Sequence, residues 1–177
     1  MPSPDPVTAA AEYQRSLLDL LGGDDPAKAQ AATPQLVRAI VAEAGARLRT
    51  RPAPKEWSVL ECIGHIVDGE LVSSTRYRWI LAHDKPPLIG YDQDLWVDRL
   101  HHNDANVDEM LTMFEGLRRA NIALWERTPA ADRARIGMHS ERGPESYELT
   151  FKLIAGHDRN HLAQARRALS AGGGTPA

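Results

Sequence analysis

Residues 57–70 read WSVLECIGHIVDGE, and this stretch decides the fold. Ser58 and Glu61 form a capping box: the Ser58 side chain accepts from the N–H three residues on, and the Glu61 side chain reaches back to the N–H of Ser58. Apolar and small residues then recur every three or four positions, which is the period of a helix packed on one face. The stretch therefore predicts a helix from Ser58 to about Ala82.

Four further segments show the same helical period. They cover residues 7–21, about 33–51, 104–127 and 146–170, with short turns of helix near 25–31 and 91–96. Gly22 marks the end of the first, and Thr33 followed by Pro34 marks the start of the second. No segment alternates as a strand does, so we expect no sheet beyond an incidental bridge. The sequence predicts an all-α fold, a four-helix bundle with an additional N-terminal helix.

Composition places this bundle in a single domain. The chain has 177 residues and a net charge of 21 − 24 = −3, with 42% hydrophobic and 25% charged residues. These values are typical of one globular domain, which we expect to span 1–177 with its core at about 33–170 and a flexible tail at 171–177. The acidic balance disfavours nucleic-acid binding. We see no apolar run of about 20 residues and no export signal, so we expect a cytoplasmic protein that does not bind membranes.

Histidines lie on the inward seams of two of these helices. On the helix from Ser58 the seam residues, spaced 3, 4, 3 and 4, are Cys62, His65, Gly69, Val72 and Arg76. On the last helix the seam contains His157 and His161, one turn apart on a single face. Facing helices could therefore bring three imidazoles to one ion and leave positions open for water or substrate, which is the catalytic pattern of coordination. On spacing alone, hydrogen-bonded core histidines remain the alternative.

Five other residues are candidates for the surroundings of this site. Asp68 and Asp158 lie within a turn of the histidines and could orient imidazoles, or could form ion pairs or face solvent. For Arg76 we favour an ion pair over an anionic substrate. His139 lies in a Gly-flanked loop, where it could line a pocket or hold the loop, and Tyr91 could cover the site or pack over the bundle end.

Four motifs in this order resemble the DinB/YfiT-like superfamily. They are residues 57–70, YDQDLW at 91–96, the loop 139–143 and GHDRNHLAQ at 156–164, and the similarity runs from about Thr33 to Leu169. The resemblance implies a four-helix bundle that holds one divalent metal through His65, His157 and His161. It also implies a homodimer.

The activities that the resemblance implies are of two kinds. Some members are thiol-dependent S-transferases of the bacillithiol or mycothiol type or a thiol-dependent isomerase, and others are described as metal-dependent hydrolases. A bound divalent ion (Zn²⁺, Ni²⁺ or Fe²⁺) lowers the pKa of a bound water or thiol and so serves either reaction. We expect a small-molecule substrate and, for a transferase, a low-molecular-weight thiol as partner. The alternative is a non-catalytic stress-response or interaction bundle in which the metal is structural.

Overall fold

The computed structural model describes residues 9–171. Its helices are α1 (Ala10–Leu21), α2 (Pro26–Ala44), α3 (Val59–Ala82), α4 (Gln93–Arg99), α5 (Val107–Arg127) and α6 (Tyr147–Ala171). Its strands are β1 (Pro87–Leu88), β2 (Ile136–His139) and β3 (Gly143–Ser146), and short 3-10 turns lie at Gly45–Arg47, His102–Asp104 and Ala130–Ala134.

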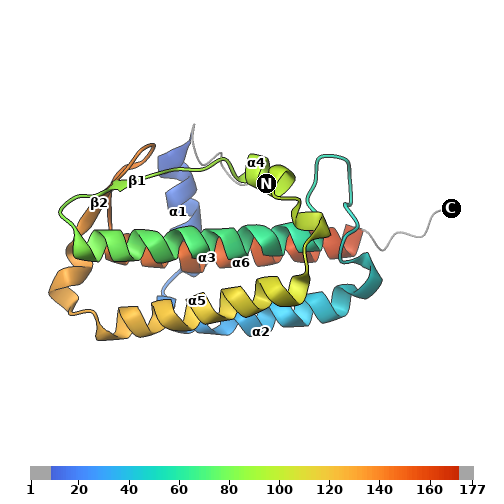
Figure 1. Ribbon diagram of the computed structural model, residues 1–177, viewed down its shortest axis with the longest axis horizontal. Helices are drawn as coiled ribbons and strands as arrows, with labels where there is room; N and C mark the ends of the chain where they lie inside the picture. The colour runs from blue at the N-terminus through green and yellow to red at the C-terminus, as the bar shows by residue number, and fades with distance from the viewer. Residues whose placement is uncertain (1–8, 172–177) are drawn as a thin grey trace.

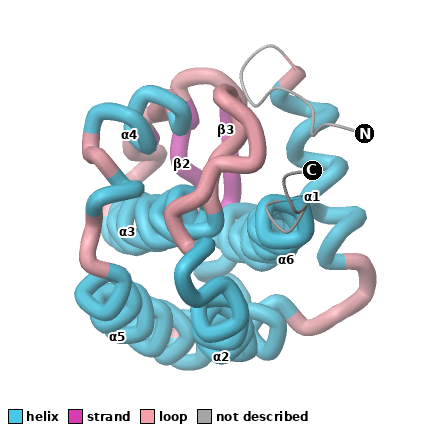
Figure 2. The backbone as a smooth tube through the Cα atoms, turned by 90° about the vertical axis from the view of Figure 1, so that its right-hand side faces the viewer, coloured by secondary structure: helices cyan, strands magenta, loops and turns pink. Residues whose placement is uncertain are grey.

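The four long helices α2, α3, α5 and α6 form the bundle. Viewed end on, they occupy four corners, with α1 packed outside α6 (Figure 2). In the side view α3 and α6 run antiparallel along the whole length of the molecule, and α2 and α5 lie beneath them (Figure 1). The predicted all-α bundle with an additional N-terminal helix is confirmed, although residues 7 and 8 of the expected first helix lie outside the described residues.

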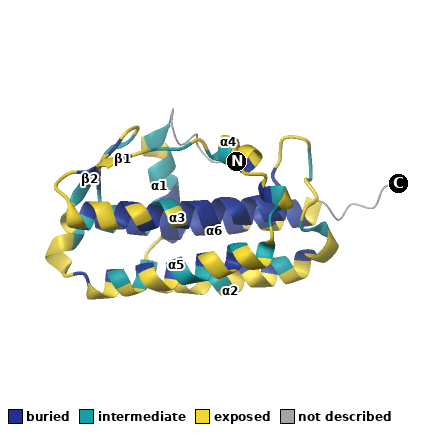
Figure 3. Ribbon diagram, viewed as in Figure 1, coloured by how far each residue is buried: buried dark blue, intermediate teal, exposed yellow. Residues whose placement is uncertain are grey.

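Helix α3 is the most enclosed element of the bundle. Every residue from Trp57 to Glu70 is buried, whereas α2 and α5 expose their outer faces (Figure 3). The predicted capping box begins this helix, with Ser58 Oγ accepting from the Glu61 N–H at 3.2 Å and Ser58 N–H donating to Glu61 Oε2 at 2.7 Å. A helix held at its start and covered on all sides over its first three turns fixes the side chains there firmly, which suits a segment that carries functional groups.

Helix α2 differs from the prediction at its start. Asp25 caps the helix by accepting from the N–H groups of residues 27 and 28, and Pro26, not Pro34, is the proline at the first positions. Pro34 lies inside the helix and cannot donate to the carbonyl of Gln30, four residues earlier. That carbonyl instead accepts from Arg118 Nη1 of α5 at 3.2 Å. Because of this tertiary hydrogen bond, α2 continues through Pro34, where the sequence predicted that a new helix begins.

A three-stranded sheet corrects the expectation of no more than an incidental bridge. β1 pairs in parallel with β2, and β2 pairs antiparallel with β3, with His139 opposite Gly143. The strands have two to four residues each. Segments this short, interrupted by glycine and proline, carry no readable alternation. The sheet closes one end of the α3–α6 pair and brings the 139–143 turn toward α1 (Figure 1).

Helix α1 packs against α6 through a glycine. A Cβ on Gly156 would lie 2.6 Å from the carbonyl carbon of Leu17 and 3.0 Å from its Cα, so only glycine permits this approach. Gly22, with φ of +63°, ends α1 as predicted. Within residues 9–171, no helix is both long and apolar enough to cross a membrane. The expected tail falls largely on residues 172–177, which lie outside the described residues.

Candidate metal centre

The structure brings His65, His157 and His161 together between α3 and α6. Each offers one ring nitrogen, and the three nitrogens all lie within 4.8 Å of one another. Their ring centroids are 4.4 to 4.8 Å apart, and all three side chains are buried. The antiparallel arrangement of the two helices places the second turn of α3 opposite the middle of α6. Three buried nitrogens therefore converge from two elements.

Hydrogen bonds leave ring nitrogens of this cluster without partners. His161 Nδ1 lies 2.8 Å from Gln164 Oε1, and because an amide oxygen only accepts, the proton of the neutral ring belongs on Nδ1. His161 Nε2 is then a bare lone pair, and it has no hydrogen-bond partner. His65 Nε2 and His157 Nε2 are 2.9 Å apart, while Nδ1 of each ring is unpartnered. Buried polar atoms are normally satisfied, so this set points to a ligand.

Burial keeps the three rings neutral. Desolvation is the largest cause in each case: it lowers the pKa of His157 to about 4, that of His161 to about 3, and that of His65 well below its ordinary value. The neighbouring histidines lower the pKa values of His65 and His161 further. A metal is bound by the neutral imidazole, so the cluster is in its ligating form at neutral pH.

The surroundings are shaped to the three rings. A Cβ on Gly69 would come within 3.1 Å of His157 Cε1, so the glycine on the α3 seam makes room for this imidazole. Trp57 packs over the other two rings, with centroid distances of 5.2 Å to His65 and 6.0 Å to His161. The donor set of nitrogens, their missing partners and this cradle all fit a divalent ion with an affinity for imidazole.

A cavity of about 90 Å³ adjoins the histidines. It is lined by residues of α1, α3, α6, the 90–93 loop and the 139–142 turn: Tyr13, Gln14, Leu17, His65, Gly69, Val72, Ser73, Arg76, Gly90, Tyr91, Gln93, His139, Glu141, Arg142, Thr150, Leu153, Ile154 and His157. His65 and His157 thus face a space that a small molecule could enter. The sequence-predicted pocket candidates His139, Tyr91 and Arg76 all line the same cavity.

Asp68 and Asp158 point to other partners than the three histidines. Asp68 Oδ2 lies 2.6 Å from Nε2 of His102, a buried histidine. Asp158 accepts from Arg118 Nη1 at 2.5 Å and from Thr33 Oγ1 at 2.8 Å. Asp158 thus forms an ion pair with Arg118, and Asp68 forms a buried hydrogen bond with His102.

Arg76 and Tyr91 also have defined surroundings. Arg76 Nη2 donates to the carbonyl of Ile89 at 2.5 Å, and within residues 9–171 the expected ion pair is not formed: the nearby Glu145 carboxylate pairs with Arg142 instead. Tyr91 packs on Trp96 with centroids 4.4 Å apart and lies 6.2 Å from the His65 ring. Burial raises the pKa of its hydroxyl, so Tyr91 is protonated at the edge of the cavity.

Cys62 is not part of the cluster. Its side chain is fully buried in the core, and burial raises the pKa of its thiol to about 12. The residues that sequence reasoning missed are Gln164 as the partner of His161, and Tyr13, Gln14 and Arg142 as cavity wall. Gln164 could have been found from its i, i+3 spacing to His161. The other three depend on the packing of α1 and the sheet, for which the sequence carries no local signal.

Comparisons with known proteins place the chain in a family and agree with this fold. A family model described as the DinB superfamily matches residues 27–165. A Bacillus cereus protein named "Putative metal-dependent hydrolase" is 27% identical over 107 residues, which cover 60% of this chain and 61% of that protein. An Oceanobacillus iheyensis protein with the same description is 25% identical over 119 residues, covering 67% of this chain and 68% of that one. The chain thus spans about three fifths of the length of the Bacillus cereus relative.

Among solved structures, YfiT from Bacillus subtilis superposes with a TM-score of 0.75. The match covers 99% of this chain and 94% of that chain at 17% sequence identity. That protein is described as a probable metal-dependent hydrolase with an unusual four-helix bundle topology. At this level of identity the likeness shows the fold.

Proposed function

The chain belongs to the DinB superfamily, and on this premise we propose that it is a divalent-metal-dependent hydrolase acting on a small molecule. The observation that carries the proposal is the convergence of His65, His157 and His161 beside a cavity. These three residues would hold the ion. When bound, a divalent ion supplies a nucleophile near neutral pH by lowering the pKa of a bound water.

Other residues of the chain prepare the site for this chemistry. Gln164 holds the His161 ring with its Nε2 lone pair free, and Gly69 leaves space for the His157 ring. The indole of Trp57 packs against the rings of His65 and His161 and helps to fix them in place. The cavity lined by His65 and His157 gives the substrate its entrance.

The cavity also supports a catalytic reading over a purely structural metal. Structural zinc sites use four protein ligands and are closed. Within residues 9–171, the cluster offers three histidine nitrogens, and two of these histidines line the cavity. An ion bound there would keep coordination positions for a molecule in the cavity. The non-catalytic alternative would need a fourth ligand from elsewhere.

The experiment combines metal analysis with an activity panel. Purified protein should contain about one divalent ion per chain and hydrolyse members of a panel of small esters and amides, with activity lost on chelation and restored by metal. Full metal retention in the His157→Ala, His161→Ala double variant would refute the ligand assignment. No hydrolysis by the metal-loaded protein, together with thiol transfer when a low-molecular-weight thiol and an electrophile are supplied, would replace the hydrolase by the S-transferase. Homodimerisation remains a prediction of the resemblance.

A further inference from the structure

The cavity beside the three histidines contains two buried polar side chains with unused donors. They are Arg76 on α3 and His139 at the end of β2, which are 8% and 3% exposed. They come from elements 60 residues apart in sequence, and neither belongs to the metal cluster. Because buried donors are normally paired, each unpaired one on a cavity wall indicates a missing acceptor.

Arg76 is a buried cation without a carboxylate. Its Nη2 holds the backbone carbonyl of Ile89, and its Nε has no hydrogen-bond partner. Burial lowers its pKa and nearby Arg142 lowers it further, while the Glu145 carboxylate, already paired with Arg142, partly offsets them. A guanidinium is always charged in proteins, so the charge persists at a cost in desolvation. An anion in the cavity would offset this cost, and the free Nε–H offers it a donor.

His139, which lines the same cavity, carries a second unpaired donor. Its Nδ1 accepts from the backbone N–H of Glu141 at 3.2 Å, so the proton of the neutral ring belongs on Nε2. That Nε2 has no partner. Burial, with Arg142 and Arg76, lowers its pKa to about 4. The ring is therefore a neutral N–H donor.

The other charges around the cavity are compensated or exposed. Arg142 pairs with Glu145 through two hydrogen bonds of 2.5 and 3.1 Å, and Gln14 of α1 donates to the same carboxylate at 2.6 Å. Glu141 also lines the cavity, with its carboxylate against Gly90, and is exposed. Among the described residues, Arg76 is thus the buried charged side chain of the wall that has no ion-pair partner.

We propose that Arg76 and His139 form a subsite that binds an anionic group of the substrate, a carboxylate or a phosphate. This inference rests on the proposed function only in treating the bound molecule as the substrate. The two donors are present whatever reaction the protein catalyses. The same cavity is lined by His65 and His157, so a molecule anchored by its anionic end would remain in reach of the metal centre. A volume of about 90 Å³ suits a small acid.

Titration calorimetry tests the subsite directly. Malonate and inorganic phosphate, titrated separately into metal-loaded protein, distinguish the two kinds of anion. We expect one of them to bind, with affinity lowered at least about tenfold in Arg76→Gln, less in Arg76→Lys, and severalfold in His139→Asn. The matched control is Arg78→Gln, which removes the same charge from the exposed side of α3 and should bind as the wild type does. Circular dichroism and metal content verify that each variant is folded and loaded.

A metal-free arm separates this inference from the proposed function. Binding that depends on Arg76 both with and without metal supports the subsite, even if no hydrolysis is ever found. Binding that needs metal and is the same in Arg76→Gln places the anion on the ion, which overturns the subsite and leaves the hydrolase proposal standing. Absence of binding of either anion to the folded wild type also overturns it.

Discussion

At the residue scale, Gln164 orients one of the three histidines from outside the cluster. It is half-buried, outside the cluster, and touches His161 through a single hydrogen bond. That bond fixes which nitrogen of His161 carries the proton and how the ring is turned. Partners of this kind affect metal affinity because a mobile or wrongly protonated ring must be reorganised before it can bind.

Replacing Gln164 by Leu should therefore weaken metal binding by about 10- to 100-fold while leaving the fold intact. Competition with a chromophoric chelator measures this affinity. Gln35→Leu, an exposed position on α2, is the matched control and should bind as tightly as the wild type. Equal affinities in wild type and Gln164→Leu would show that His161 needs no orientation.

Metal retention should extend to lower pH than ordinary imidazoles allow. Protons and metal compete for the same lone pairs, and unperturbed imidazoles would release metal near pH ~6.5. Burial lowers the pKa of His157 to about 4 and that of His161 to about 3. Because lowered pKa values preserve the neutral form, metal should stay bound at pH 5.5 and be released as the pH falls through about 4.

The same pKa values determine how the stability of the metal-free protein changes with pH. Between about pH 6.5 and 4 the unfolded chain binds more protons than the folded one at His157, so stability falls as the pH drops through this window. Metal content after dialysis at a series of pH values tests the metal retention. Urea unfolding of the metal-free protein at the same pH values tests the stability. Release already complete at pH 6 would contradict the burial of the site.

The three histidines could be predicted as one cluster because each lies on a seam of regular period. His102 could not, because the 3-10 turn that buries it against Asp68 has no period. The unpaired donors of Arg76 and His139 could not be predicted from the sequence either. Whether a buried cation finds a carboxylate depends on packing between distant elements.

At the element scale, a glycine governs the joining of α1 to α6. Gly156→Ala should push Leu17 away and destabilise the protein by about 1–3 kcal/mol, as overpacking does. The matched control is Gly116→Ala in α5, where a Cβ meets nothing within 4 Å and should stabilise by about 0.5–1 kcal/mol. Urea unfolding of both variants gives the two signs. A neutral Gly156→Ala would mean that α1 is loosely placed, and with it the α1 wall of the cavity.

Helix existence could be predicted better than helix boundaries. The capping box formed by Ser58 and Glu61 marks the start of α3 in the sequence, and the structure confirms this start. The start of α2 predicted from Pro34 was wrong because a prediction from neighbouring residues cannot include the Arg118 guanidinium. That distant group donates to the Gln30 carbonyl, which Pro34 leaves without its helical donor. The small sheet was not predicted for a related reason. Its short strands are held in place by the helices around them more than by the preferences of their own residues.

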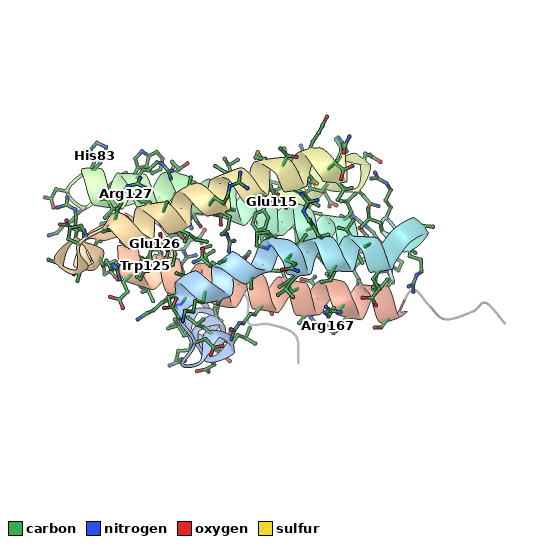
Figure 4. The ribbon with its side chains drawn as sticks, turned by 90° about the horizontal axis from the view of Figure 1, so that it is seen from below. His83, Glu115, Trp125, Glu126, Arg127 and Arg167 are labelled. Carbon is green, nitrogen blue, oxygen red and sulfur yellow. The ribbon has the colours of Figure 1, made fainter. Side chains whose placement is uncertain are left out.

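At the scale of the whole molecule, one buried ion network joins four helices. Arg118 of α5 pairs with Asp158 of α6 and with Glu70 of α3, and it also holds the Gln30 carbonyl of α2. On the outer face, an exposed ion pair links Arg38 of α2 to Glu115 of α5, whose position is labelled in Figure 4. The interior network therefore fixes the register of the bundle.

Removing the central cation should be costly. Arg118→Met leaves Asp158 and Glu70 buried without their cationic partner and should destabilise the protein by about 3–5 kcal/mol. Arg119→Met, the exposed neighbour on the same helix, should change stability by less than about 0.5 kcal/mol. Restoration of most of the loss by adding Glu70→Gln and Asp158→Asn would locate the cost in the unpaired charges. A small effect of Arg118→Met alone would mean that the network is solvated.

The central claim is that one ion joins α3 to α6, and His65 is its only ligand from α3. Thermal unfolding of wild type and His65→Ala, each with and without Zn²⁺, tests it most directly, with His83→Ala, at the exposed end of α3, as the control (Figure 4). Zn²⁺ at about 1,000 times Kd should stabilise wild type and control by about 4 kcal/mol, or about 10 °C in Tm. Without metal the three proteins should unfold at similar temperatures, because Leu60 and Val67 still pack α3 into the core. The account predicts a much smaller Zn²⁺ shift in His65→Ala; an equal shift in all three proteins would contradict it.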